Sequence, residues 1–302
     1  MIEAKYFDKL ADQKVRCRLC PHDCLIRPGK SGLCFVRYNQ DGALQALSYG
    51  RVSGIHLDPI EKKPLYFFHP GSTILSVGGI GCNLNCPFCQ NWQIAQPKDL
   101  IKGGIIPADE PPGIVRRLTE PLSVEQLVGL AEDHRDRGSI GVAFTYNEPF
   151  IWFEYVLEAS RALKARGLKT VLVTNGYVHE EPLKELLPFI DAMNIDVKGF
   201  SDDLYRKLGG RLDPVLRTAE LAGGACHVEI TNLLITGLNT EEAQIEGLVD
   251  WIADTLGPET PLHLSRYFPA RNFKAPPTSI ADLETAQRIA ASRLRSVILG
   301  NV

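Results

Sequence analysis

The sequence contains three closely spaced cysteines whose pattern suits a reactive metal centre. Cys82, Cys86 and Cys89 follow the spacing Cys-x3-Cys-x2-Cys, and no fourth cysteine follows nearby. Iron–sulfur clusters of the four-iron type normally take four thiolates from the protein. Three thiolates leave one iron open, and an open position is what distinguishes a catalytic metal site from a structural one. The spacing therefore predicts a four-iron cluster with one iron free to bind another molecule.

A second group of cysteines lies near the N-terminus and is complete with four thiols. The Pro28–Gly32 turn could bring the last of them back to the other three. Four thiolates suffice for a structural zinc site, which we favour, with an auxiliary iron–sulfur cluster and unligated thiols as alternatives. His22 lies within the group and is expected to cap it or to face solvent. The four cysteines are Cys17, Cys20, Cys24 and Cys34.

The composition is that of an ordinary globular protein. The chain has 302 residues, of which 44% are hydrophobic and 23% charged, enough for one large domain and an accessory segment. A net charge of −3 without a long basic run argues against nucleic acid as the main partner. Met1–Leu10 does not resemble a signal peptide, and no apolar run approaches the ~20 residues of a membrane span. We therefore predict a cytoplasmic protein with no membrane partner.

From about residue 73 onward, short apolar runs alternate with helical patterns. Such runs are typical of parallel strands that are buried on both faces. The alternation predicts an α/β fold built as a partial (β/α)6 TIM-like barrel, with a doubly wound sheet as the alternative. The expected strands are Thr73–Val77, Ile140–Phe144, Thr170–Val173, Ala192–Val197, Val228–Ile235, Leu262–Leu264 and Val297–Leu299.

The helix starts and the domain limits can also be read from the sequence. Ser123 and Gln126 form a capping box, and Ser279 opens the last helix. We expect residues 1–70 to form a cysteine-rich N-terminal accessory segment and residues 71–302 to form the core domain. Lys98–Pro121 is a Pro- and Gly-rich insertion, for which a lid over the site and a solvated surface loop are the two alternatives.

Polar residues follow the expected strands at their carboxyl ends. Glu148 follows the second strand, Asn175 the third, Asp196 and Lys198 end the fourth, and Ser265 follows the sixth. Loops at this end of a barrel converge on one mouth, so we expect these side chains to share a site with the three cysteines. Ordinary turns and a surface ion pair are the alternative reading of the same residues.

The cysteine pattern, with Phe88 before the last cysteine and a βα array after it, resembles the signature of radical S-adenosylmethionine (SAM) enzymes. The resemblance implies a [4Fe-4S] cluster whose open iron is chelated by the amino and carboxylate groups of SAM. It also implies reductive cleavage of SAM to a 5′-deoxyadenosyl radical, which abstracts hydrogen from a substrate. Within that site, Glu148 is the expected acceptor for the SAM ammonium group and Lys198 the partner of its carboxylate. Asp196, Asn175 and Ser265 are expected to bind the ribose or the substrate.

Further motifs along nearly the whole chain narrow the resemblance to the AmmeMemoRadiSam system radical SAM enzymes, relatives of pyruvate formate-lyase activating enzymes. These motifs are Asp58–Leu65, Pro70–Ser72, Gly81–Asn91, Thr145–Pro149, Val173–Tyr177, Pro261–Arg266 and Gly300–Val302. Family members usually continue into a tail with a Cys-Pro-x-Cys pair, so we expect no metal held by such a tail here.

The expected function is therefore that of a radical SAM enzyme that needs a reducing electron donor. The substrate is a protein or a small molecule, and glycyl-radical activation of a partner protein is one candidate reaction. The alternative from another class is a non-catalytic zinc-binding scaffold for protein interactions.

Overall fold

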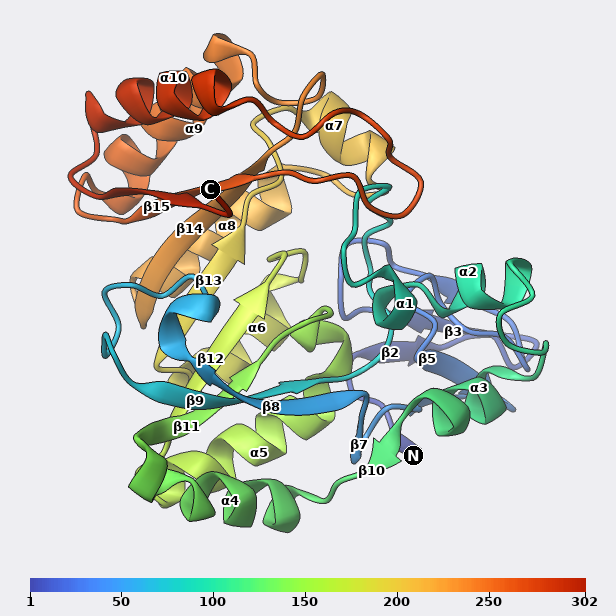
Figure 1. Cartoon of the computed structure of the whole chain (residues 1–302). Coiled ribbons are helices and arrows are strands. Elements are labelled where there is room, and N and C mark those ends of the chain that lie inside the picture. Colours follow the sequence, from blue (N-terminus) through green and yellow to red (C-terminus); the bar gives the residue numbers. More distant parts are fainter.

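The computed structural model describes all 302 residues and is built around a curved, eight-stranded sheet (Figure 1). Within this sheet, β9 and β11 to β16 pair in parallel, whereas β8 pairs with β9 antiparallel. The end strands β16 and β8 do not pair with each other, so the barrel is open. In spatial order the strands are β16 (Val297–Gly300), β15 (Leu262–Arg266), β14 (His227–Leu234), β13 (Ala192–Asp196), β12 (Lys169–Thr174), β11 (Ser139–Phe144), β9 (Thr73–Gly78) and β8 (Gly54–Pro59).

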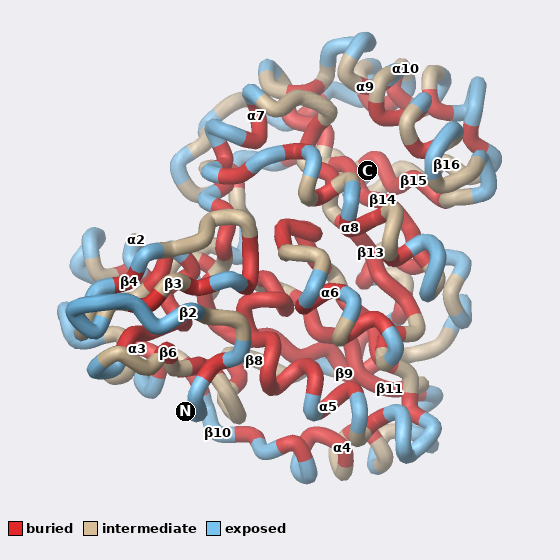
Figure 2. The backbone as a smooth tube through the Cα atoms, turned by 180° about the vertical axis from the view of Figure 1, so that it is seen from behind, coloured by how far each residue is buried: buried red, intermediate tan, exposed pale blue.

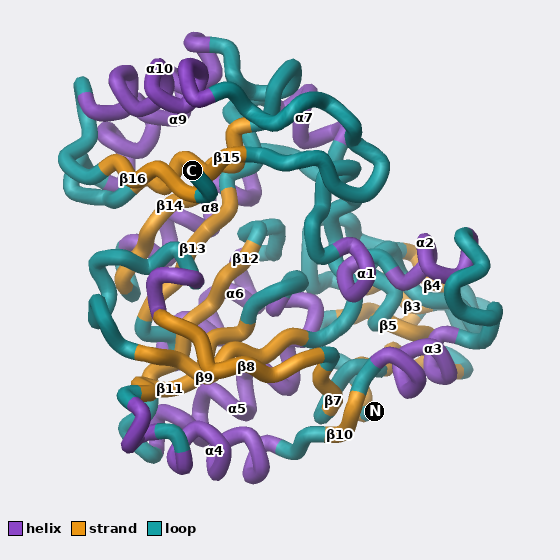
Figure 3. The backbone as a smooth tube through the Cα atoms, viewed as in Figure 1, coloured by secondary structure: helices purple, strands orange, loops and turns teal.

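The predicted strands are thus all present, and the partial barrel is confirmed in place of a doubly wound sheet. Helices lie along the outer side of the sheet (Figure 3). They are α4 (Val124–Asp133), α5 (Phe153–Ala165), α6 (Glu180–Leu186), α8 (Asp213–Gly223), α9 (Glu242–Trp251) and α10 (Ile280–Ala291). The predicted capping box of Ser123 and Gln126 begins α4, and Ser279 caps α10 through the Asp282 N–H. None of the helices combines the length and apolar character that crossing a bilayer requires.

Shorter helical segments connect these elements. They are η1 (Ile60–Lys62), α1 (Trp92–Ala95), α2 (Pro97–Lys102), α3 (Pro111–Leu118), η2 (Arg135–Arg137), η3 (Pro149–Trp152), η4 (Leu187–Phe189), α7 (Asp202–Lys207) and the π-helical turn η5 (Ile252–Leu256).

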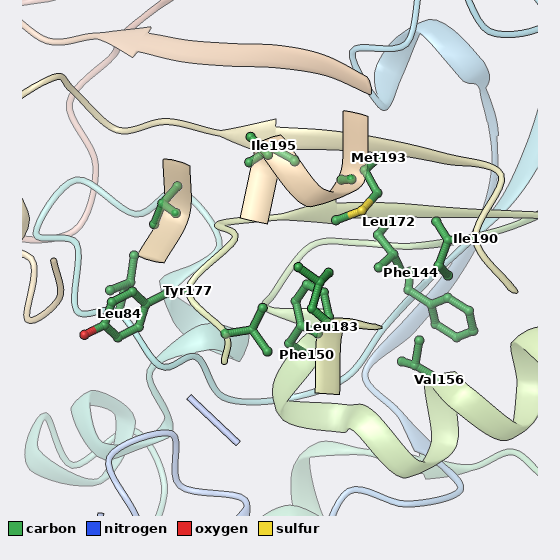
Figure 4. Close-up of a cluster of buried hydrophobic side chains, with 14 of the residues drawn as sticks. Leu84, Phe144, Phe150, Val156, Leu172, Tyr177, Leu183, Ile190, Met193 and Ile195 are labelled. Carbon is green, nitrogen blue, oxygen red and sulfur yellow. The ribbon is translucent and has the colours of Figure 1, made fainter. Parts of the chain in front are cut away.

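The main hydrophobic core lies between the sheet and its outer helices. Phe144, Leu172 and Met193, from three adjacent strands, face Val156 of α5 and Leu183 of α6 (Figure 4). All five side chains are buried, and full burial of such a side chain contributes ~1.5–3 kcal/mol. Figure 2 shows the same division, with buried strands at the centre and exposed positions on the outer turns. This layer holds the strand ends in fixed register.

The N-terminal region forms two small antiparallel sheets beside the barrel (Figure 1). Val15, Ile26 and Leu44 belong to the same buried cluster as Phe144, so the region shares the barrel's core. The main sheet also takes in β8, which precedes residue 71; the division into 1–70 and 71–302 stays a prediction. The strands are β1 (Ile2–Glu3), β2 (Phe7–Lys9), β3 (Val15–Cys17), β4 (Leu25–Ile26), β5 (Arg37–Gln40), β6 (Ala43–Ala46) and β7 (Arg51–Val52).

The insertion at Lys98–Pro121 covers the N-terminal region. Ile114 and Val115 of α3 are buried in one cluster with Phe35 and Val36, and β10 (Glu120–Pro121) pairs with β7. None of its residues lines the cavity at the strand ends described below. In this structure the insertion therefore packs over the N-terminal sheets and not over the cavity.

Candidate radical SAM active site

A cavity of about 280 Å³ lies at the carboxyl ends of the parallel strands. It brings together every residue that the sequence placed at the predicted site, although these residues come from four strand ends and the loop after β9. The cysteines on its wall are Cys82, Cys86 and Cys89, and the other predicted residues on it are Glu148, Asn175, Asp196, Lys198 and Ser265. The arrangement follows from parallel strands of similar length, whose ends meet at one mouth.

The loop that carries the three cysteines is held tightly at its start. Gly79 donates its N–H to the Asn147 side chain over 2.9 Å, and the Asn147 amide donates to the Gly81 carbonyl over 3.0 Å. Gly81 has a φ of +88°, and a Cβ there would lie 2.2 Å from the Cys34 carbonyl oxygen. Only glycine fits this position, where the cysteine loop presses against the N-terminal region.

Two asparagines fix the Cys82 end of the loop. The Asn83 amide donates to the Tyr177 carbonyl over 2.7 Å, and the Asn175 amide donates to the Asn83 side-chain oxygen over 3.0 Å. The Asn175 amide also lies 3.6 Å from the Cys82 sulfur. Asn175 was predicted to bind ribose or substrate; in the structure its amide holds the cysteine loop. Burial raises the pKa of the Cys82 thiol well above its ordinary value, and a donor beside the sulfur acts against that effect.

Glu148 is a buried carboxylate with most of its acceptor capacity in use. One oxygen accepts the Phe150 N–H over 2.9 Å and the Thr174 hydroxyl over 2.7 Å, and the other accepts the Asn175 N–H over 2.8 Å. Burial raises the pKa of Glu148 to about 7 against the opposing effect of these hydrogen bonds. A carboxylate has about four acceptor positions, so one remains open for a ligand.

Asp196 and Lys198 form an ion pair on the cavity wall, with 2.8 Å between the carboxylate and the ammonium nitrogen. Their side chains are 28% and 16% exposed, so the pair is not the surface pair of the alternative reading. Burial alone would lower the pKa of Lys198, but the Asp196 carboxylate and the Cys86 thiol keep it above its ordinary value. Lys198 is thus a cation next to the cysteines.

Two further residues of this site, Arg271 and Asn301, were not predicted from the sequence. Arg271 donates to the Cys86 carbonyl over 2.7 Å and pairs with Asp99, which secures the far end of the cysteine loop. Asn301 lines the cavity from the segment after β16. Only the Gly300–Val302 motif pointed to Asn301, and no local pattern marks Arg271, because its partners are distant in sequence.

The four N-terminal cysteines line a second, much smaller cavity of about 10 Å³, together with His22, Arg37 and Asn83. His22 does not face solvent as expected, since its ring nitrogen donates to the Asn83 carbonyl over 2.7 Å. Burial raises the pKa of the Cys17 thiol to about 11. No three His, Cys, Asp or Glu side chains converge closely enough to share one metal ion. The favoured zinc interpretation therefore finds no support in the structure.

Comparison with known proteins decides the family. The model of the radical SAM superfamily matches residues 77–252, which span the three cysteines and four of the strand ends. The chain belongs to the radical SAM superfamily. It is an enzyme by that membership, and the zinc-scaffold alternative is wrong.

Several known proteins are similar to this radical SAM enzyme in sequence or in fold. The uncharacterized protein MJ0808 of Methanocaldococcus jannaschii is 39% identical over 305 residues, covering 100% of this chain and 86% of its own. The pyruvate formate-lyase-activating enzyme of Clostridium pasteurianum is 25% identical over 57% of this chain and 66% of its own. The crystal structure of a radical SAM methyltransferase from Sphaerobacter thermophilus has a TM-score of 0.55 at 18% identity, over 77% of this chain and 67% of its own, and shows the shared fold. The AmmeMemoRadiSam assignment stays a prediction.

Membership of this superfamily implies a [4Fe-4S] cluster and SAM, and the cavity suits both. It offers three thiols without a fourth, as a cluster with one open iron requires. Beside them lie an acceptor with one free position, Glu148, and a cation, Lys198, which are the partners that the amino and carboxylate ends of SAM need.

Proposed function

We propose that Cys82, Cys86 and Cys89 hold the [4Fe-4S] cluster and that this radical SAM enzyme acts on a glycyl radical protein. The observation that carries the assignment of the site is the single cavity that joins three thiols to a buried carboxylate and a cation. When bound and reduced, the cluster supplies the electron that splits the sulfonium of SAM and releases a 5′-deoxyadenosyl radical.

The residues of the chain bind and orient the cofactor. Glu148 accepts a hydrogen bond from the amino group of SAM at its one open acceptor position. The hydrogen bonds at its other three positions hold the carboxylate rigidly in place. Lys198 binds the carboxylate of SAM, and Asp196 and Ser265 serve the ribose or the substrate. Asn175 keeps its amide on the cysteine loop and supports Cys82.

Two relatives support a protein substrate. They are named pyruvate formate-lyase-activating enzyme and (2S)-3-sulfopropanediol dehydratase activating enzyme, from Clostridium pasteurianum and Klebsiella oxytoca. An activating enzyme of this kind removes one hydrogen atom from a glycine of its partner. That reaction consumes one SAM and one electron from a reducing donor, and it leaves the radical on the partner.

The test is an anaerobic assay for 5′-deoxyadenosine with the reduced enzyme and candidate glycyl radical proteins. The expected result is stimulated cleavage of SAM together with a glycyl radical signal in the electron paramagnetic resonance (EPR) spectrum of the partner. A partner with its radical glycine changed to Ala is the control and should give no signal. Cleavage no higher than that of Cys86→Ala, with every partner and without any, would refute the proposed role of the site.

A further inference from the structure

The second cysteine cavity differs from an ordinary structural zinc site because its thiols do not converge on one ion position. Cys17, Cys20, Cys24 and Cys34 line one enclosed space of about 10 Å³. Four thiolates around one zinc ion lie ~2.3 Å from it, which leaves no space between the sulfurs that could admit a water-sized sphere. No three of these side chains converge in that way, so the four thiols are not arranged around one ion.

The cysteines of the active site provide an internal comparison. Cys82, Cys86 and Cys89 share one cavity, and they too do not converge on a single-ion position. Their superfamily implies a four-iron cluster, in which each thiolate binds a different iron. The N-terminal cysteines likewise share one cavity without a single-ion position, and they have one thiol more, which matches the four ligands of a complete cluster.

A buried cation with two unused donors lines the same space. Arg37 is 1% exposed and forms part of the wall of the cavity. One of its nitrogens donates to Glu154 over 2.7 Å, but Nε and Nη2 have no hydrogen-bond partner. Glu154 does not line the cavity, so the pair presents its positive end to the thiols. Two unused donors on a buried guanidinium are costly unless an anion accepts from them.

We propose that Cys17, Cys20, Cys24 and Cys34 hold a second iron–sulfur cluster with full thiolate ligation, and that Arg37 donates to its sulfur atoms. A cluster with four thiolates is anionic, and its sulfurs accept hydrogen bonds, so it satisfies both the charge and the donors of Arg37. The site has no open position, so SAM does not bind there.

The N-terminal cysteine site is in direct contact with the cysteine loop of the active site. The Cys34 carbonyl packs against Gly81, and His22 donates to the Asn83 carbonyl. Gly81 and Asn83 flank Cys82 in the sequence, so the ligand loops of the two sites are in contact. A cluster at the second site would therefore hold the N-terminal region in the position that supports the catalytic loop.

The experiment is metal and spectroscopic analysis of the triple variant Cys82→Ala/Cys86→Ala/Cys89→Ala, which lacks the catalytic cluster. After anaerobic reconstitution it should keep about four irons and four sulfides per chain, half of the wild-type content. Its reduced EPR signal should not change when SAM is added, whereas that of the wild type should. Zinc in place of iron, or no metal, in the folded variant overturns the proposal. The result does not depend on SAM cleavage, so it is separate from the test of the proposed function.

A second set of variants covers the case in which the triple variant fails to fold. In the otherwise wild-type chain, Cys24→Ser/Cys34→Ser should lose half of the iron, and the matched control Cys226→Ser should lose none. Full iron in the first variant overturns the proposal. For Arg37, the double variant Arg37→Met/Glu154→Met removes both charges of the pair. It should shift the reduction potential of the second cluster to a lower value, and an unchanged potential removes Arg37 from the site.

Discussion

The two cysteine sites of this enzyme lie side by side but differ in ligand number and in space. The first has three thiols on the wall of a cavity of about 280 Å³ at the barrel mouth. The second has four thiols around an enclosed space of about 10 Å³ between the N-terminal sheets and the cysteine loop. The comparison shows how one chain separates a reactive site from a supporting one. The reactive site lacks one ligand and adjoins a large cavity, whereas the supporting site has a full set of ligands and no spare room.

The polar residues around the two sites differ in the same way. At the open site, Glu148 keeps one acceptor position free, and Lys198 is near the surface of the cavity. At the closed site, Arg37 is buried on the wall of the thiol-lined cavity and has two donors without a partner. Glu148 and Lys198 can therefore bind a ligand that enters from solution, whereas Arg37 can donate only to a group that the four thiols hold.

The largest expected difference between the sites comes from removal of one ligand of the open site. Cys86→Ala should abolish 5′-deoxyadenosine formation and remove the catalytic cluster, because two thiolates leave that cluster exposed to loss. Iron analysis and the assay for 5′-deoxyadenosine measure both effects, and Cys226→Ser is the control. Full iron and full cleavage in Cys86→Ala would contradict the assignment of the open site.

Removal of ligands from the closed site should act on stability before chemistry. Cys17→Ser/Cys20→Ser removes the cluster proposed to accept from Arg37 Nε and Nη2, and a buried donor left without an acceptor costs ~1–3 kcal/mol. Anaerobic thermal unfolding should show a clearly lower midpoint, while SAM cleavage per remaining catalytic cluster should fall less. The comparison fails if the variant unfolds like the wild type but has lost its cleavage activity.

The sequence predicted the open site well and the closed site poorly, for physical reasons. Buried parallel strands appear as apolar runs, and their ends must converge, so Glu148 and Lys198 could be placed before the structure was known. Arg37 and Arg271 could not, because their partners lie 117 and 185 residues away in the sequence. Such contacts depend on how the N-terminal sheets and the loop after β15 pack on the barrel, which no local pattern encodes.

The spatial arrangement of the four N-terminal thiols could not be predicted from the sequence either. Four cysteines in sequence suit a zinc ion or a cluster alike, and only the distance between folded segments distinguishes them. The same holds for His22, whose contact with the Asn83 carbonyl joins residues 61 apart in the chain.

Glu148→Gln tests whether the open site owes its ligand affinity to the free acceptor position. Loss of one charge-assisted contact should weaken SAM binding by ~1.5–3 kcal/mol, which is about tenfold to a hundredfold. Anaerobic calorimetry measures the affinity, and iron content should stay at the wild-type value. Glu246→Gln on the exposed face of α9 is the matched control. Unchanged affinity in Glu148→Gln would remove this carboxylate from the SAM site.

The smallest expected effect concerns pH and separates a titrating site from one with a fixed charge. Burial raises the pKa of Glu148 to about 7, so the carboxyl is protonated below that pH and ionised above it. Only the ionised form accepts fully from the amino group of SAM, and its affinity should therefore fall by up to about tenfold per pH unit below pH 7 and level off above it. Arg37 does not titrate in this range, so the spectrum of the second cluster in the triple cysteine variant should stay constant. Calorimetry and visible spectra between about pH 6 and about pH 8 test both statements. If the pH dependence of SAM affinity persists in Glu148→Gln, the titrating group lies on SAM itself. The contrast between the two sites would then rest on space and ligand number alone.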